Sequence, residues 1–455
     1  MRVGVWARAA ALWVWGMTAS AAPGDHIRVG DYTTIAPELE TGVEFRTNSF
    51  LSVGALQSTL RRDRAVPSFN YVLSPSLDVR VDHPKVRFDV GGTYELRKFF
   101  DADLASRLDR FSDFTANVKL DVLPKGVFGF RIMDNAVRRN RVSDNPFRPS
   151  SLLSQIRNDL SGFLTVRPGP DLDLEIGGGW AFHNYRVPQA AGQSDLNTRN
   201  TRQAFVNVRW RFFPSTSFVI EGQYHKNLWR TNWIPTGQTV TEEDLGNGAV
   251  RTYGEFLAMP DSDMAKIMSG LRGRITRNLV MTSMIGWGLA RYDVESVNEE
   301  SAEDRGFGAE ANPALAGFDQ NLKGIQGLLV LLKADLDFGY AAERTFGQRL
   351  TLMYRKDFQD SFFTNFVHQN HLRVDLGSRW GRFLRTEAGF GPRFEEYVGE
   401  VDRNDIFLQA DLDLEVLPTK WMGIRLGGMW VQRASSQREV QYDNLQAHFL
   451  LRFSY

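Results

Sequence analysis

The sequence contains no cysteine, which excludes disulfide bonds and thiolate metal sites. It also has no excess charge of either sign, because 54 Lys and Arg residues balance 54 Asp and Glu residues. A nucleic-acid binder needs a basic face that neutralises phosphates. We therefore expect no nucleic-acid partner.

Long apolar runs are missing from the body of the chain as well. The longest, Leu328 to Leu332, is far shorter than the about 20 residues that a membrane-spanning helix needs. This excludes a helical membrane protein.

The first 21 residues have a different composition. Arg2 and Arg8 precede the apolar stretch from Ala9 to Met17, and Ala19-Ser20-Ala21 has the small side chains of a signal-peptide cleavage site. We predict a signal peptide at residues 1–21 and export of the mature protein from the cytoplasm.

Apolar and polar residues alternate along much of the mature chain. In residues 114–122, FTANVKLDV, and again in residues 405–416, DIFLQADLDLEV, every second side chain is apolar and many of the others are charged. This period of two predicts strands with one apolar and one charged face. A soluble sandwich and a membrane barrel both fit such strands, so periodicity alone does not decide between them.

The lengths of the connections favour the barrel. Short connections with a proline occur within residues 120–130, 164–174, 210–220 and 414–424, and long polar connections lie between the short ones. Alternation of short turns with long loops is typical of an up-and-down barrel with tight periplasmic turns.

We therefore predict an all-β fold, a transmembrane antiparallel up-and-down β-barrel of about 18 strands (16–20), with short periplasmic turns and longer outer loops. Residues 22–37 are expected to form a periplasmic N-terminal segment and residues 38–455 the barrel. The predicted strands are 38–48, 74–82, 86–98, 111–122, 127–138, 155–167, 172–185, 201–212, 217–229, 264–276, 279–293, 324–338, 346–357, 365–378, 382–397, 404–416, 421–433 and 441–455.

Aromatic residues recur at two levels along these strands, which predicts the two aromatic girdles of a membrane barrel. Trp210, Phe212, Trp380 and Trp421 are assigned to the level of the short turns, and Trp180, Phe182, Trp229, Trp287 and Trp430 to the far level.

The chain ends in AHFLLRFSY, an alternating strand that stops on an aromatic residue. Together with the signal peptide and the alternating segments, this ending resembles that of bacterial outer-membrane β-barrel proteins of the porin type. The resemblance implies an outer-membrane location in contact with outer-membrane lipid. It also implies that the barrel-assembly machinery reads Phe449, Leu451, Phe453 and Tyr455 as an assembly signal, with Tyr in place of the commoner terminal Phe.

A narrower resemblance concerns function. The size, the strand number, the Arg-rich strands and the proline turns are similar to those of porin-type barrels associated with exopolysaccharide export. This resemblance implies an outer-membrane exit channel for a secreted polysaccharide, working with a periplasmic polysaccharide export protein. No single motif is specific to that group.

The charged face of the strands supplies the candidate site. By parity these side chains point into the barrel, where they either pair into a network that stiffens the wall or line a hydrated lumen. The predicted lumen-lining residues are Arg87, Asp89, Glu95, Arg97, Lys119, Asp121, Arg209, Arg211, Lys333, Asp335, Arg373, Asp375, Asp411 and Asp413.

Motifs of catalysis are missing. The seven histidines are scattered over different segments, and there is no HExxH, no GxSxG and no phosphate-binding glycine loop. We predict no catalytic residues, no metal site and no cofactor. The preferred hypothesis is the polysaccharide exit channel. The alternatives are a general or sugar-selective diffusion porin for small polar solutes and, from another class, a barrel enzyme or surface adhesin.

Overall fold

A computed structural model of the chain describes residues 26–47, 67–101, 112–142, 152–186, 197–229, 234–235, 241–244, 250–253, 256–257, 261–293, 329–342, 346–360, 366–398, 403–436 and 441–455. These residues form strands and turns. Within them, no helix has the length and apolar character needed to cross a membrane.

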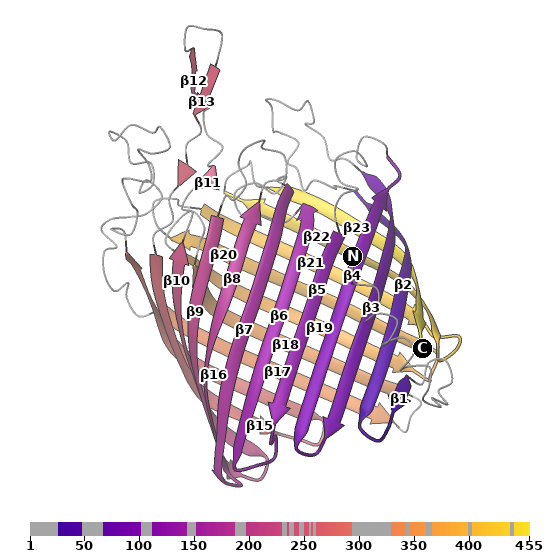
Figure 1. Ribbon diagram of the computed structural model, residues 1–455, viewed down its shortest axis with the longest axis vertical. Helices are drawn as coiled ribbons and strands as arrows, with labels where there is room; N and C mark the ends of the chain where they lie inside the picture. Colours follow the sequence, from indigo (N-terminus) through magenta and orange to yellow (C-terminus); the bar gives the residue numbers. More distant parts are fainter. Residues whose placement is uncertain are drawn as a thin grey trace, which may run out of the picture.

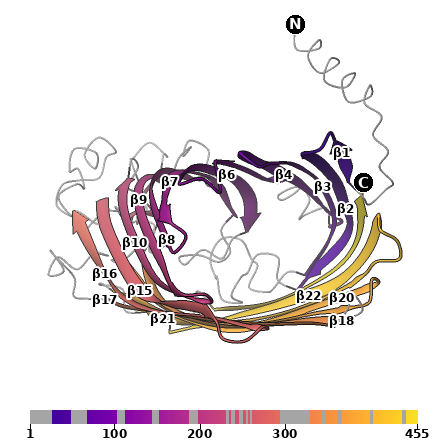
Figure 2. The same cartoon turned by 90° about the horizontal axis from the view of Figure 1, so that it is seen from below.

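Eighteen antiparallel strands form one closed barrel (Figures 1 and 2), and a short strand, β1, joins the same sheet. Each barrel strand pairs with its neighbours in the chain, and β2 pairs with β23 to close the ring, from Glu38 opposite Ser454 to Arg46 opposite Gln446. The predicted fold class is therefore confirmed. The strands of the sheet are β1 (Ile27–Val29), β2 (Thr33–Arg46), β3 (Ser68–His83), β4 (Val86–Phe99), β5 (Ser112–Val122), β6 (Phe128–Val142), β7 (Leu152–Gly169), β8 (Leu172–Arg186), β9 (Asn197–Phe213), β10 (Thr216–Trp229), β15 (Asp261–Arg274), β16 (Leu279–Asp293), β17 (Leu329–Ala342), β18 (Phe346–Asp360), β19 (Phe366–Trp380), β20 (Leu384–Val398), β21 (Arg403–Val416), β22 (Met422–Ser435) and β23 (Tyr442–Ser454).

The short connections all join the strands at one end of the barrel, and those between β3 and β10 are seen at the bottom of Figure 1. Two-residue turns join β3 to β4, β7 to β8 and β9 to β10. Gly381, in the turn between β19 and β20, has a φ of 61°, a conformation that glycine adopts without the steric cost of a Cβ atom. The connection between β10 and β15 contains two small hairpins, in which β11 (Ile234–Pro235) pairs with β14 (Phe256–Leu257) and β12 (Thr241–Asp244) with β13 (Val250–Tyr253).

The N-terminal part differs from the sequence-based boundary. β2 begins at Thr33, and β1 pairs with its first residues, Ile27 lying opposite Ile35. Because β23 ends beside Glu38, the first residues of β2 have no partner on that side except β1. β1 thus pairs with the part of the β2 edge that β23 does not reach, and this edge would otherwise be open.

The outer surface of the barrel is apolar. Large hydrophobic side chains alternate along the strands and are between 38% and 61% exposed, among them Leu164, Ile176, Val206, Ile267, Ile285, Leu376, Phe390, Leu412 and Leu426. A carboxylate interrupts this surface on β6, where Asn158 Nδ2 of β7 donates a 3.0 Å hydrogen bond to Asp134. An apolar exterior on a closed antiparallel barrel is the arrangement that a bacterial outer membrane requires, and the chain is an outer-membrane protein.

One predicted girdle residue faces the other way. Trp229 is 7% exposed and packs inside the barrel, so its assignment to the outer girdle was wrong. On β10 the odd-numbered residues point inward, and Trp229 shares that parity with His225 and Asn227, which line the lumen. It belongs to an inner apolar cluster with Met264, Ala290, Tyr292, Leu331, Phe358 and Phe366.

The wall carrying this cluster is tightly folded around glycines of β15 and β16. A Cβ atom at Gly286 would overlap the carbonyl oxygen of Ile267, and one at Gly270 would overlap that of Ser283. These two positions therefore permit a close approach of adjacent backbones that any other residue would prevent.

The apolar exterior predicts a depth-dependent response to charge. Ile267 is in the middle of β15 and 53% exposed, whereas Ile275 is 60% exposed in the short turn after the same strand. We expect Ile267→Arg to make folding into bilayers less favourable by about 2–4 kcal/mol and Ile275→Arg by about 0–1 kcal/mol. Urea titrations of folding into vesicles measure both values, and equal costs would contradict the placement of this face in lipid.

Candidate functional site

Ion pairs that skip a strand identify the inner face of the barrel. Arg131 on β6 reaches Glu175 on β8 at 3.2 Å, across the intervening β7. Lys333 on β17 reaches Glu221 on β10 at 3.2 Å, across β16 and β15. Side chains two or three strands apart converge on the concave side of a barrel and diverge on the convex side, so these pairs lie in the lumen.

The fourteen residues predicted to line the lumen all take part in ion pairs. Most of these pairs join adjacent or next-but-one strands, as expected for cross-strand partners. The pairs are Arg87–Asp82, Asp89–Arg80, Arg97–Glu95, Arg97–Glu44, Lys119–Asp121, Asp121–Arg131, Arg209–Asp173, Arg211–Asp173, Lys333–Glu221, Asp335–Arg355, Arg373–Asp375, Arg373–Asp411 and Asp413–Arg425.

The lumen differs between its two ends. Near the short turns, the charged side chains are open to solvent: Arg349 is 69% exposed and Arg87 46%. Near the long loops, the side chains of Arg433 and Asp405 are 0% exposed. The short-turn half of the lumen is therefore open to solvent, and the loop half is the more closely packed, narrow half.

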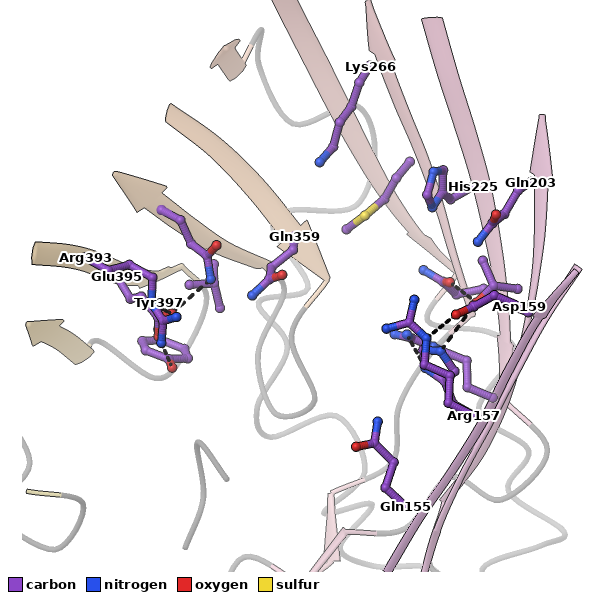
Figure 3. A pocket seen from close by; sticks show the side chains of 18 of the residues that line it. Gln155, Arg157, Asp159, Gln203, His225, Lys266, Gln359, Arg393, Glu395 and Tyr397 are labelled. Carbon is purple, nitrogen blue, oxygen red and sulfur yellow. Dashed lines mark hydrogen bonds and ion pairs between the residues drawn. The ribbon is translucent and has the colours of Figure 1, made fainter. Parts of the chain in front are cut away.

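A cavity of about 520 Å³ lies in the narrow half and is the candidate site. Both walls of the barrel contribute to it, β7, β8, β9, β10 and β15 on one side and β18, β19, β20, β21 and β22 on the other. Figure 3 shows Arg157, Asp159 and Gln203 facing Arg393, Glu395 and Tyr397 across this space. Strands from opposite sides of the ring therefore line one cavity, whose volume is that of a small-molecule site.

The first wall combines cations with histidine. Arg157 forms an ion pair with Asp159, and the Arg199 guanidinium donates a 2.9 Å hydrogen bond to Nδ1 of His183. Arg199 also lies 5.4 Å from the ring centre of Trp229, which connects this wall to the inner apolar cluster. Stacking on an aromatic ring and hydrogen bonding together hold the guanidinium in place.

The second wall is built from arginines stacked on aromatic rings. Arg393 and Arg433 lie 4.2 and 4.9 Å from the ring centre of Phe407, and Arg403 lies 3.9 Å from that of Tyr397. Arg433 donates hydrogen bonds of 2.5 and 3.1 Å to Asp405.

Glu395 completes this wall by accepting hydrogen bonds from Tyr397 at 2.8 Å and Gln369 at 2.9 Å. These hydrogen bonds hold the Glu395 carboxylate, the Tyr397 hydroxyl and the Gln369 amide together.

Lys266 connects the two walls at one side of the cavity. Its ammonium group lies 2.7 Å from Asp357 and 2.5 Å from the carbonyl oxygen of Phe358, both on β18. It also lies 4.6 Å from the centre of the Phe358 ring, which belongs to the inner apolar cluster. The cluster and Lys266 therefore fill the side of the lumen next to β16, beside the cavity.

The cavity has an excess of positive charge. Five cations line it, Arg157, Arg199, Lys266, Arg393 and Arg433, against two carboxylates, Asp159 and Glu395. Asp357 and Asp405 neutralise part of this excess from just outside the lining.

The lining contains no serine or cysteine nucleophile. Within the described ranges, no group of three or more His, Cys, Asp or Glu side chains is arranged to hold a metal ion. The arrangement is suited to contacting a polar solute in passing, by charge and hydrogen bonding.

None of the fourteen sequence-predicted residues lines this cavity. Some, such as Arg209 and Asp413, lie nearer the short turns than the cavity does, and others, such as Glu95 and Arg97, lie on β4, which does not contribute to it. The cavity residues have the same inward parity, but polar and aromatic residues are mixed among them, and the strands that meet there are distant in the chain. His183 and His225, scattered in the sequence, both line it.

The C-terminal residues are placed as follows. Phe449 and Tyr455 are 40% and 45% exposed, and the Tyr455 backbone amide donates a 3.2 Å hydrogen bond to the carbonyl of Pro37 at the short-turn end. Leu451 and Phe453 lie on the same strand opposite Thr41 and Leu39 of β2. Their role as an assembly signal stays a prediction.

No family model matches the chain. No curated protein sequence matches it either.

Solved structures with a similar arrangement are outer-membrane proteins. The outer membrane protein opdK from Pseudomonas aeruginosa is 12% identical, with a TM-score of 0.39 over 92% of this chain and 98% of that chain. A BenF-like porin from Pseudomonas fluorescens Pf-5 is 11% identical, with a TM-score of 0.44 over 93% and 99%. Pseudomonas aeruginosa OccK2 (OpdF) is 11% identical, with a TM-score of 0.43 over 93% and 97%.

The contrast between buried and open ion pairs predicts different costs of breaking them. Removing one partner of the fully buried Arg433–Asp405 pair leaves an uncompensated charge, so Asp405→Ala should destabilise the barrel by about 3–5 kcal/mol. Asp337→Ala, which breaks the solvent-exposed Arg349–Asp337 pair, should cost about 0–1 kcal/mol. Equilibrium unfolding of both variants measures the difference. If Asp405→Ala were as stable as Asp337→Ala, the second wall would not be rigid.

Proposed function

We propose that the protein is a diffusion porin through which small polar solutes cross the outer membrane, with a modest preference for anions. The observation that supports this most directly is the cavity of about 520 Å³ that is lined from both walls. Its volume is in the range that holds a small-molecule ligand. The five cations of its lining favour negatively charged solutes, and the partial neutralisation by carboxylates keeps binding weak enough for release.

The exopolysaccharide exit channel preferred on sequence grounds receives no support from the described residues. A polymer chain needs a continuous wide path, whereas Arg403, Arg433 and Lys266 occupy the loop half of the lumen. No feature of the described short-turn end points to a docked export protein. Uptake or release of small solutes therefore fits the cavity better than polymer secretion.

Ion selectivity tests the proposal. Arg157→Gln/Lys266→Gln removes two of the five lining cations, so the anion-to-cation permeability ratio should fall roughly twofold or more. Arg138→Gln/Lys356→Gln removes the same charge from the outer face at the level of the cavity and should leave the ratio unchanged. Reversal potentials of single channels in planar bilayers under a salt gradient report the ratio.

Either of two results contradicts the proposal. The first is a wild-type barrel that conducts no ions. The second is an unchanged reversal potential in the Arg157→Gln/Lys266→Gln variant.

Solute size separates the porin from the exit channel. Vesicles containing the refolded barrel should swell rapidly in monosaccharides and slowly in oligosaccharides, because a cavity of about 520 Å³ accommodates a small molecule more readily than an oligomer. A barrel that releases long trapped polysaccharide from vesicles as fast as a monosaccharide would instead support the exit channel.

A further inference from the structure

The outer face of the barrel carries a row of charged residues on four successive strands. Arg202 (β9) lies opposite Lys226 (β10), Lys226 opposite Asp263 (β15), and Asp263 opposite Arg291 (β16). Residues on either side of each in sequence face the lumen: His225 and Asn227 flank Lys226 and line the cavity, and Ala290 and Tyr292 flank Arg291 in the inner cluster. All four side chains of the row therefore point toward lipid.

The row lies at the upper edge of the apolar exterior. Its members are ten to twelve residues from the short-turn end of their strands. At ~3.3 Å per residue and a tilt of about 45°, that distance is about 23–28 Å along the membrane normal, close to the height of the apolar band. Tyr224 and Trp287, below the row, are 43% and 49% exposed, and Trp180, which lies opposite Arg202, is 43% exposed, as expected for a girdle at the headgroup level.

The charges of the row do not cancel. Asp263 accepts a 2.5 Å hydrogen bond from Tyr224 and lies 3.9 Å from the ammonium of Lys226. Arg202 and Arg291 flank this group, are exposed, and form no ion pair with another residue of the described ranges. The guanidinium groups of Arg202 and Arg291, with Lys226 between them, thus face the membrane surface. Three strand spacings of ~4.8 Å place the two arginines within about 15 Å of one another.

The other end of the same strands has no such charges. Outward positions near the short turns are occupied by Trp210, Phe212, Phe218, Leu271 and Met281. The positive row therefore belongs to the leaflet at the long-loop end, which is the outer leaflet of a barrel with periplasmic short turns.

From this placement we propose that Arg202, Lys226 and Arg291 bind the phosphorylated sugar headgroup of an outer-leaflet glycolipid. Guanidinium groups bind phosphate in a bidentate manner, and a cation at a membrane surface gains from anionic lipid. A charged side chain on the lipid face is unfavourable near hydrocarbon unless it meets the headgroup layer. The lipid's phosphates would supply the partners that Arg202 and Arg291 lack among the described residues. This inference is independent of what passes through the lumen.

Binding of lipid A to the purified full-length barrel in neutral detergent tests the proposal. Native mass spectrometry over a lipid A titration gives the Kd for the wild type and for Arg202→Gln/Arg291→Gln, which should bind about tenfold or more weakly. The matched control is Arg138→Gln/Lys356→Gln. Arg138 and Lys356 are also outward-facing and ten residues from the short-turn ends of β6 and β18, but their register neighbours are Phe114 and Ile156, and Leu332 and Asn370.

The control variant should retain the wild-type Kd within about threefold, and neither phosphatidylcholine nor millimolar inorganic phosphate should displace lipid A. Equal weakening in both double variants would show diffuse attraction and overturn the proposal. No weakening in Arg202→Gln/Arg291→Gln would overturn it as well, and displacement by inorganic phosphate would assign the row to a soluble anion.

Folding and conduction keep these outcomes interpretable. Each variant is first checked for the heat-dependent gel shift of a folded barrel. If Arg202→Gln/Arg291→Gln does not fold, Arg202→Lys/Arg291→Lys keeps the charge and loses the bidentate fork, and it should still bind lipid A severalfold more weakly than the wild type. Because the row faces lipid, lipid A binding can be lost while single-channel conductance persists. This separates failure of this inference from failure of the proposed function.

Discussion

The hydrogen bonding of the backbone is the constraint on which this molecule depends. In hydrocarbon no water satisfies an unpaired N–H or C=O group, so a sheet is stable there only if its first and last strands meet. β2 and β23, separated by nearly the whole chain, meet in register over nine residue pairs. Once they do, the face of every other side chain is determined, since alternate residues point to opposite sides of the wall. The apolar exterior and the charged interior are both consequences of this closure.

The interior is not uniform, because the same alternation can build either a water-filled channel or a protein core. Near the short turns, inward residues are charged, paired across strands and open to solvent. Toward the long loops, Trp229, Leu331 and Phe358 fill one side of the lumen with apolar contacts. The Arg433–Asp405 pair and its stacked rings make the opposite side rigid. Between them remains the cavity, whose lining side chains are held by ion pairs, hydrogen bonds and stacked rings.

Sequence patterns were sufficient for the strands because the information for them is local. A period of two and the short connection Thr276-Arg277-Asn278 identify β16, for example, at residues 279–293, as the structure has it. Trp229 was assigned to the wrong face because only its distance along the strand was considered. Its odd number, shared with the inward-facing His225 of the same strand, places it inside the barrel. Phe358 departs from the parity of its strand: beyond Lys356, β18 pairs only with β19, and the ring turns inward over Lys266. The cavity could not be predicted from the sequence, because Arg157 and Arg393 face each other only through the curvature of the whole ring.

The charged residues on the outer face also indicate the orientation of the barrel in the membrane. Lys98, Arg138, Arg202, Lys226, Arg291 and Lys356 all lie ten to twelve residues from the short-turn end of their strands, and Glu396 and Asp443 reach the same level on β20 and β23. Apart from Asp134 in the middle of β6, this offset is nearly constant around the circumference, so the upper edge of the apolar surface is parallel to the ring of short turns. The hydrocarbon thickness that the protein accepts is therefore the same on every side, and the barrel can stand upright without thinning or thickening the bilayer around it.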